Sequence, residues 1–229
     1  MTPEKRESAF IHLVIPRAEE LFPLRRVWEE NFPGEKGRFD GEFSFAFPSW
    51  GEAEAFLRSL PAELRGRATV GRGKTLEEEL ILRCVERGVT VAVAESCTGG
   101  RVSARITSVP GSSRVFLGGV VAYSNEAKRD LLGVSHQLLS DRGAVSREVV
   151  LAMAEGVRRT MGADVSVAVS GIAGPEGGSP EKPVGTVWFA LDTGGRKEAE
   201  RFLLQGSRWE IQDGASSQAL WMLLEGVSG

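Results

Sequence analysis

Hydrophobic and polar residues follow recognisable periods along most of the chain. In the first part, Ala9 to Ile15 and Phe39 to Phe47 show a period of two, which predicts two strands. Apolar residues at helical spacing predict a helix from Glu19 to Asn31. Trp50 to Leu60 lies between prolines and is a second predicted helix. With a short strand at Ala68 to Val70, these elements form a small α+β unit of about 70 residues.

Two short glycine-containing motifs occur in this first unit. Gly71 to Lys74 is interpreted as a hinge or linker, which divides the chain into residues 1–74 and 75–229. Gly34 to Gly37 has the GxxG form of the loop that clamps nucleic acid in KH domains. Residues 1–74 contain 12 Lys and Arg and also 12 Asp and Glu, so a basic groove is not expected. A tight turn is therefore the favoured interpretation.

The second unit alternates apolar strands with amphipathic helices. Ser and Thr precede its helices and glycines follow them, as is typical of helix caps. This order of elements predicts an α/β fold: a three-layer sandwich around a mixed β-sheet, with a small N-terminal α+β domain in front. The predicted helices are Thr75 to Arg87, Val102 to Val109, Glu126 to Leu132, the segment between Ser146 and Gly162, and the segment after Ser207. The predicted strands are Val89 to Ala94, Val115 to Ala122, Val165 to Val169, Val184 to Leu191 and Glu198 to Leu204.

Composition narrows the function classes. The chain has 229 residues, 41% hydrophobic and 26% charged, which is ordinary for a globular protein. Its net charge of −3 gives no electrostatic footprint of a nucleic-acid binder. The two cysteines make no disulfide framework, no apolar run approaches a membrane span, and no signal-peptide core is seen, so a cytoplasmic location is expected. His12 and His136 lie far apart and no acidic cluster has ligand spacing, so no metal or cofactor is predicted.

The turn after the predicted strand Val89 to Ala94 is the first candidate for chemistry. Residues Glu95 to Gly100, ESCTGG, join this strand to a helix, which exposes the side chain at the turn. The free N–H groups of the new helix would then point at whatever that side chain attacks. Ser96 is a candidate nucleophile. The alternative, in which Ser96 or Thr98 only caps the helix, stays open on this segment alone.

Lys128 lies in the first turns of the helix predicted from Glu126. A cation is unfavourable near a helix N-terminus, a cost without structural gain unless the lysine is partly neutral. A neutral lysine can act as a general base for a serine. The alternative is that Lys128 points into solvent. Tyr123, the only tyrosine, could equally be a core residue with its hydroxyl at the rim.

Ser170 to Pro183 forms a long loop with four glycines and three prolines in 14 residues. Loops of this length in compact domains are usually functional. This one leaves a buried strand, where open α/β sheets bind ligands. Its glycines allow N–H groups to face an anion, and Lys182 supplies charge, so a binding loop is favoured over a plain connection.

Three segments, Val93 to Gly100, Gly118 to Lys128 and Ser170 to Val187, together resemble the C-terminal domain of the CinA family, the nicotinamide mononucleotide deamidases. The resemblance covers the chain from about Thr75 onward, and three motifs in the right order make it specific. More faintly, the first part resembles the KH-like connecting domain of full-length CinA proteins. No segment resembles the family's molybdopterin-binding-like domain, so its metal-dependent pyrophosphatase role is expected to be absent.

The resemblance implies hydrolysis of nicotinamide mononucleotide to nicotinate mononucleotide and ammonia. It assigns Ser96 as nucleophile, Lys128 as the base that takes and returns the proton, and Tyr123 as a group that orients Lys128 or hydrogen-bonds Ser96. Backbone N–H groups after Ser96 would stabilise the oxyanion. Cys97 is the rival nucleophile, and both the family pattern and its position one residue further along argue against it.

The resemblance also implies a substrate-binding set, with two departures from the family pattern. Ser170 stands where threonine is usual and keeps the hydroxyl. The final helix usually carries two arginines four residues apart, and here Gln212 follows Arg208, which would weaken phosphate binding if the second arginine grips that group. The expected substrate-binding residues are Thr98, Gly99, Gly100, Ser170, Gly171, Ala173, Gly174, Lys182 and Arg208.

The expected partners are the mononucleotide substrate and, as the family implies, a second copy in a homodimer; neither nucleic acid nor membrane is expected. The competing hypothesis is not enzymatic. In it, the chain is a competence- or damage-related regulatory or nucleic-acid-binding protein with a degenerate site. The neutral first unit and the intact set of Ser96, Tyr123 and Lys128 argue against that hypothesis.

Overall fold

The computed structural model describes residues 8–15 and 41–229. Three predictions therefore lie outside the described residues: the helix from Glu19 to Asn31, the GxxG loop from Gly34 to Gly37, and the first residues of the strand predicted from Phe39. Within the described chain, the strands form two sheets, one of three strands and one of five.

The small sheet has the order β2-β1-β3 and is antiparallel throughout. Its strands are β1 (Ala9–Val14), β2 (Glu42–Phe47) and β3 (Ala68–Gly71), close to the predicted positions. Two helices follow β2, namely α2 (Trp50–Ser59) and the short α3 (Ala62–Arg65). The period-two phenylalanines of β2 account for the packing, because the rings of Phe45 and Phe47 lie against Phe56 of α2.

The five-stranded sheet has the order β5-β4-β6-β7-β8 and is mixed. Its central strand β4 (Val91–Glu95) runs parallel to both β5 (Phe116–Val121) and β6 (Val165–Gly171). Beyond β6, the strands β7 (Thr186–Asp192) and β8 (Lys197–Leu203) are antiparallel. The carboxyl ends of β4, β5 and β6 therefore meet at one edge of the sheet.

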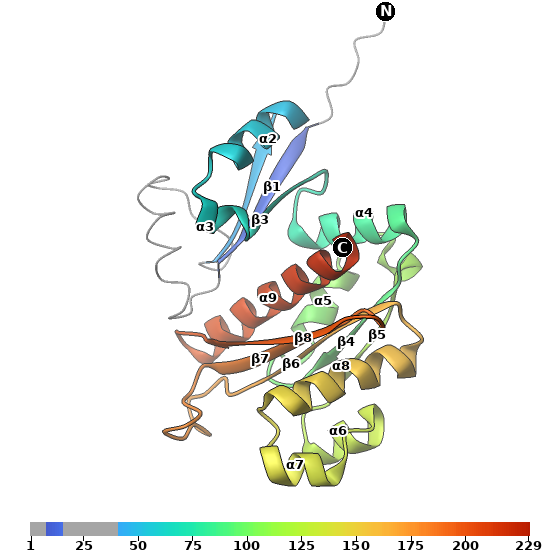
Figure 1. Ribbon diagram of the computed structural model, residues 1–229, viewed down its shortest axis with the longest axis vertical. Helices are drawn as coiled ribbons and strands as arrows, with labels where there is room; N and C mark the ends of the chain where they lie inside the picture. Colours follow the sequence, from blue (N-terminus) through green and yellow to red (C-terminus); the bar gives the residue numbers. More distant parts are fainter. Residues whose placement is uncertain (1–7, 16–40) are drawn as a thin grey trace, which may run out of the picture.

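Helices cover both faces of this sheet, which confirms the predicted three-layer α/β class (Figure 1). One face carries α4 (Leu76–Arg87), α5 (Arg101–Thr107) and α9 (Arg208–Ser228). The long α8 (Arg147–Met161) covers the other face, with α6 (Asn125–Leu132) and α7 (His136–Arg142) beyond it. A single 3-10 turn, η2 (Ser112–Arg114), precedes β5. The sequence did not predict α7, whose single buried side chain leaves no apolar periodicity.

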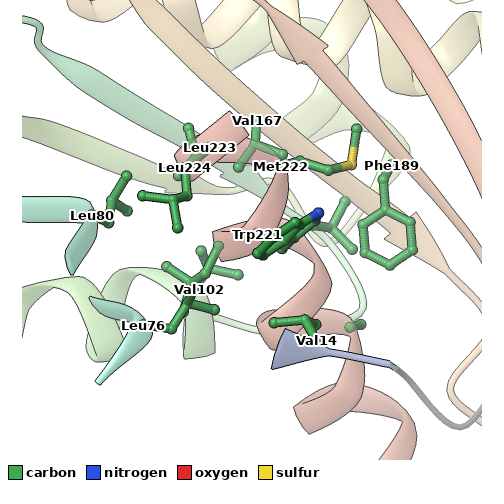
Figure 2. Close-up of a cluster of buried hydrophobic side chains, with 14 of the residues drawn as sticks. Val14, Leu76, Leu80, Val102, Val167, Phe189, Trp221, Met222, Leu223 and Leu224 are labelled. Carbon is green, nitrogen blue, oxygen red and sulfur yellow. The ribbon is translucent and has the colours of Figure 1, made fainter. Parts of the chain in front are cut away.

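The main hydrophobic core lies between the sheet, α4, α5 and α9. Figure 2 shows Leu76 and Leu80 of α4 on one side of Trp221 in α9 and Phe189 of β7 on the other. Cys84 is also fully buried in this core, as predicted. A second cluster joins the opposite face of the sheet to α8.

Helix α9 is buried on nearly all sides because it lies between the small sheet and the large sheet (Figure 1). The predicted inner face of Ile211, Ala215, Ala219, Leu220 and Leu223 is buried, and so are most of the residues between these positions. Nevertheless, among the described residues neither α9 nor any other helix combines the length and apolar character that a membrane span needs.

Residues 71–74, which were predicted as a hinge or linker, form a bonded connection instead. Gly71 ends β3, and the N–H groups of Arg72 and Gly73 donate to Glu79 Oε2 at 2.7 and 3.0 Å. Next to this connection, Arg105 of α5 forms buried ion pairs with Glu42 of β2 and Glu77 of α4, at 2.6 and 2.5 Å. The first unit is thus joined to the second by buried charges as well as by the chain.

Candidate active site

Ser96 lies immediately after β4, in the tight turn that begins α5. Its own N–H donates to the carbonyl of Val169 in β6 at 2.9 Å, which anchors the turn to the sheet. The chain then reverses through Gly99 and Gly100, whose φ angles of +60° and +96° favour glycine. The predicted strand-to-helix turn is therefore present, and Ser96 lines a cavity at its surface.

The N–H groups at the start of α5 do not point at the cavity, because the buried side chain of Glu95 takes them. The two carboxylate oxygens of Glu95 accept hydrogen bonds from the amides of Gly100, Val102 and Ser103 and from Ser103 Oγ, at 2.7 to 3.1 Å. The expectation that these helical amides serve the reaction is corrected accordingly. A carboxylate at a helix N-terminus is also favourable to the dipole, so Glu95 stabilises the turn.

Of the two amides that follow Ser96, only that of Cys97 belongs to a residue that lines the cavity. In the part of the chain that the structure describes, this amide donates to no carbonyl or carboxylate oxygen. The backbone N–H of the residue after a nucleophile is a known oxyanion-hole donor. Gly99 and Gly100 shape the turn, and neither of them lines the cavity.

Lys128 points inward from α6 toward this turn, and its side chain is among the largest fully buried ones in the protein. Its Nζ lies 3.0 Å from Ser96 Oγ and donates to the carbonyl of Ala122 at 2.9 Å and to that of Tyr123 at 3.5 Å. Burial lowers the pKa of Lys128, and the nearby Cys97 opposes this effect only in part. The alternative of a solvated lysine is therefore excluded.

The three neighbours of Nζ suit a neutral amine. A neutral lysine has two N–H bonds and one lone pair, and the two backbone carbonyls can accept both N–H bonds. The lone pair is then left for the third neighbour, the hydroxyl of Ser96. This geometry allows Lys128 to receive the proton of Ser96.

Tyr123 contributes to this cluster through its backbone, while its side chain points away. Tyr123 is 59% exposed as a residue, and its hydroxyl accepts a hydrogen bond from Arg208 Nη2 at 2.9 Å. Arg208 Nη1 in turn donates to the carbonyl of Gly174 at 2.7 Å. Within the described residues, the phenol bonds neither Ser96 nor Lys128, in contrast to the role expected for it. Tyr123 follows buried Ala122 at the strand end, and the alternation of the chain turns its ring outward.

The cavity beside Ser96 has a volume of about 280 Å³. Its walls come from the turn after β4, the start of α6, the segment before α8, the loop after β6 and the start of α9. Among the predicted site residues, Thr98, Gly99, Gly100 and Lys182 are not part of its lining. The lining residues are Ser96, Cys97, Tyr123, Lys128, Ala144, Val145, Ser170, Gly171, Ile172, Ala173, Gly174, Glu176, Gly177 and Arg208.

Two polar residues of the predicted binding loop make contacts that hold the structure together. Ser170 Oγ donates to the carbonyl of Ala144 at 2.8 Å, which ties the end of β6 to the segment before α8. Lys182 Nζ donates to the carbonyl of Arg142, the last residue of α7, at 3.0 Å. Lys182 therefore lies outside the cavity, since it caps the exposed end of a neighbouring helix.

Gln212 has a position that the sequence did not reveal. Its side chain is only 7% exposed, and Nε2 donates to the carbonyl of Cys97 at 2.7 Å. It supports the nucleophile turn from behind and does not line the cavity. A glutamine facing inward from a helix next to a catalytic turn has no distinct sequence signal, so only the tertiary contact identifies it.

Cys97 lines the cavity one residue after Ser96, and it is almost fully buried. Burial raises the pKa of this thiol to about 12, so it stays protonated at neutral pH. Since the thiolate is the reactive form, Cys97 is a poor nucleophile here. Across the described residues, no three or more His, Cys, Asp or Glu side chains gather into a group that could hold a metal ion.

Residues 73–227 match the family model described as the CinA C-terminal domain. A CinA-like protein of Gemmatimonas aurantiaca is 48% identical over 181 residues, which cover 77% of this chain and 42% of that protein. A putative competence-damage inducible protein of Symbiobacterium thermophilum is 50% identical over 187 residues, covering 75% of this chain and 44% of that protein. The chain thus spans less than half the length of these two relatives.

Solved structures agree with the sequence matches. The crystal structure of a competence/damage inducible protein from Agrobacterium tumefaciens is 41% identical and superposes with a TM-score of 0.65, over 66% of this chain and 93% of that one. A competence damage-inducible protein A from Klebsiella pneumoniae is 39% identical with a TM-score of 0.64, again over 66% and 93%.

Proposed function

The chain belongs to the CinA family, and we propose that it is an amidohydrolase that converts nicotinamide mononucleotide to nicotinate mononucleotide and ammonia. One observation carries the reaction type: Nζ of the buried Lys128 lies 3.0 Å from Ser96 Oγ at the wall of a cavity. A serine paired with a desolvated lysine is suited to acyl transfer. The substrate is supported by the resemblance of the three sequence motifs to the nicotinamide mononucleotide deamidases.

In the first half of the proposed reaction, neutral Lys128 removes the proton from Ser96 Oγ as this oxygen attacks the carboxamide carbon. The electron pair of the C=O bond moves onto oxygen, and the N–H group of Cys97 stabilises the resulting oxyanion. Such a donor contributes roughly 3–4 kcal/mol in enzymes where it has been tested. Lys128 then returns the proton to the amide nitrogen, which leaves as ammonia, and a nicotinoyl ester remains on Ser96.

In the second half, a water molecule hydrolyses this ester. Lys128, neutral again after ammonia has left, removes a proton from the water as its oxygen attacks the ester carbon. Collapse of the second tetrahedral intermediate breaks the bond to Ser96 Oγ, and Lys128 supplies the proton that restores the hydroxyl. The same residue thus serves both halves, and general acid–base catalysis of this kind contributes typically about 10²–10⁴-fold in rate.

The proposed phosphate site is Arg208 at the start of α9. Two of its N–H groups are used by Tyr123 and Gly174, and a guanidinium has five, so further donors remain for phosphate oxygens. The volume of about 280 Å³ lies at the lower end of small-molecule sites, which commonly measure roughly 300–1,000 Å³. This size supports a mononucleotide better than a dinucleotide.

The role of the first unit and the oligomeric state are further parts of the proposal. We place a domain boundary near residues 74 and 75, with the first unit as a fixed support of α5 through the ion pair that Glu42 makes with Arg105. We also propose a homodimer, on the family resemblance. Light scattering coupled to gel filtration measures the mass directly, and a monomer at working concentration would refute the dimer.

An ammonia-release assay tests the activity. The purified chain is incubated with nicotinamide mononucleotide, ammonia is quantified, and mass spectrometry identifies the product as the carboxylate. Filter binding with single-stranded RNA and DNA is run alongside. Ammonia release that disappears in Ser96→Ala supports the proposal, whereas tight nucleic-acid binding without ammonia release supports the regulatory alternative.

A further inference from the structure

The cavity contains one carboxylate that the amide chemistry does not use, that of Glu176. This residue lies in the loop after β6 and lines the same cavity as Ser96 and Arg208. Its side chain is exposed, and in the described part of the chain it takes part in no hydrogen bond or ion pair. An ionised carboxylate only accepts hydrogen bonds, so Glu176 offers the cavity unused acceptor oxygens.

A free carboxylate is unfavourable in a site that must accept a phosphate. Like charges at short range repel each other, and solvent exposure weakens this repulsion without removing it. The proton transfers are already assigned to Lys128, and the oxyanion is assigned to a backbone amide. The carboxylate of Glu176 is therefore free to accept hydrogen bonds from a part of the ligand that donates them.

The loop carries Glu176 close in sequence to the residue that contacts the proposed phosphate group, in the wall of the cavity that also holds Ser96. Gly174, two residues before it, is bonded through its carbonyl to Arg208, the proposed phosphate group. Gly171, at the other end of the segment, pairs with Val187 within the sheet beside the nucleophile strand. Between an amide held at Ser96 and a phosphate held at Arg208, a mononucleotide has its ribose.

The conformation of the loop is well determined by packing. Gly174 and Gly177 have φ angles of +77° and +90°, and a side chain added at Gly174 would run into Val184. The backbone just before Glu176 is thus fitted closely to Val184, which lies shortly before β7. A carboxylate on such a segment is better placed for recognition than one on a loose loop, because less ordering entropy is lost on binding.

We propose that Glu176 is a specificity-determining residue whose carboxylate accepts hydrogen bonds from the vicinal hydroxyls of the ribose. The inference rests on the proposed function for the identity of the ligand. Recognition of a ribose hydroxyl by an acidic side chain is common in nucleotide-binding proteins. Glu176 selects ribonucleotides over deoxyribonucleotides and, by charge repulsion, over nucleotides with a second phosphate on the sugar.

The test measures binding, so that it does not depend on turnover. Nicotinamide mononucleotide and its 2′-deoxy and 3′-deoxy forms are titrated by calorimetry into Ser96→Ala, and into the double variant Ser96→Ala with Glu176→Ala. Loss of a hydrogen bond to a charged group weakens binding by about 10-fold or more, and solvent exposure favours the lower end of this effect. We expect at least one deoxy form to bind about 10-fold more weakly than the parent nucleotide to Ser96→Ala, and this preference to shrink to about 2-fold or less in the double variant.

Glu181→Ala provides a matched control, because Glu181 is an exposed acid of the same loop that is not part of the cavity lining. Added to Ser96→Ala, it should leave the preference intact. An unchanged preference without Glu176, or no preference at all in Ser96→Ala, overturns the inference even if the chain releases ammonia. Ribose-sensitive binding that requires Glu176, in a chain that releases no ammonia, supports the inference and refutes the proposed function.

Discussion

Lys128 Nζ lies 3.0 Å from Ser96 Oγ, although 32 positions separate the two residues in the sequence. Ser96 is presented by the turn after β4, and Lys128 by a helix that follows the neighbouring strand β5. Because β4 and β5 are parallel, their carboxyl ends meet, and the two side chains converge. Four of the five predictions below depend on this pair or on the residues that hold it in place.

Separate replacement of Ser96 and of Cys97 should show which of the two is the nucleophile. Ser96→Ala should lower ammonia release at least about 10³-fold, since residues that act as one catalytic unit are individually essential. Circular dichroism and Tm should stay near those of the parent. Cys97→Ala should keep most of the activity, because the pKa of this thiol is about 12. Inactivation by thiol alkylation together with a dead Cys97→Ala would assign the nucleophile to Cys97.

The lowered pKa of Lys128 determines how we expect kcat/KM to depend on pH. Burial lowers the pKa of its amine, and a base acts only when unprotonated, so kcat/KM should rise with pH through this lowered pKa and then level off. Lys128→Arg should be almost as inactive as Lys128→Ala, because arginine keeps its proton. Both variants should bind substrate with near-normal affinity. Substantial activity in Lys128→Arg would mean that the lysine only stabilises charge.

Replacement of Lys128 by an apolar residue should stabilise the fold although it removes the activity. Since folding lowers the pKa of Lys128, the unfolded chain holds the proton more tightly, and stability rises as pH increases through the folded pKa toward the ordinary value of lysine. Lys128→Met removes this cost at neutral pH. A gain of about 1 kcal/mol would raise Tm by roughly 2–4 °C for a protein of this size. Differential scanning calorimetry checks it, and a lower Tm would contradict the desolvation argument.

Gln212 should affect turnover more than binding. Gln212→Ala removes the hydrogen bond to the Cys97 carbonyl, which would let the nucleophile turn shift without changing any cavity wall. We expect kcat to fall about 10-fold or more while KM changes little, which is the pattern of a positioning residue. Gln218→Ala, on the same helix but bonded to Arg67, is the matched control. A rise in KM alone would instead place Gln212 at the substrate phosphate.

The two cations near the binding loop should behave differently. Arg208→Ala should raise KM at least 10-fold with a smaller effect on kcat, which is the pattern of lost uniform binding. Lys182→Ala should leave both constants within about 2-fold, because its amine bonds the carbonyl of Arg142 outside the cavity. Steady-state kinetics with nicotinamide mononucleotide distinguishes the two. A raised KM in Lys182→Ala would restore the loop lysine to the site.

Most helix positions were predictable because the ends of these helices depend on local bonds. Thr75, Ser124, Ser146 and Ser207 each cap a predicted helix through the amide three residues on, and Gly88 ends one in the left-handed conformation. Such hydrogen bonds close within a few residues, so the sequence alone determines them. The nucleophile turn combines both kinds of contact, local and distant. Glu95 accepts hydrogen bonds from amides five to eight positions further on, whereas the Ser96 amide bonds the Val169 carbonyl of a neighbouring strand.

Contacts between distant residues decided the rest of the site. The sequence showed a cation in the binding loop, but Lys182 finds its acceptor 40 positions away. Gln212 reaches the Cys97 carbonyl across 115 positions. The packing of the layers decides which of several competing acceptors a long polar side chain reaches. The sequence by itself therefore determined most of the elements and the two residue types that react, a serine and a lysine. Tertiary packing selected the walls of the cavity. It also desolvated the lysine, and this desolvation makes the pair reactive.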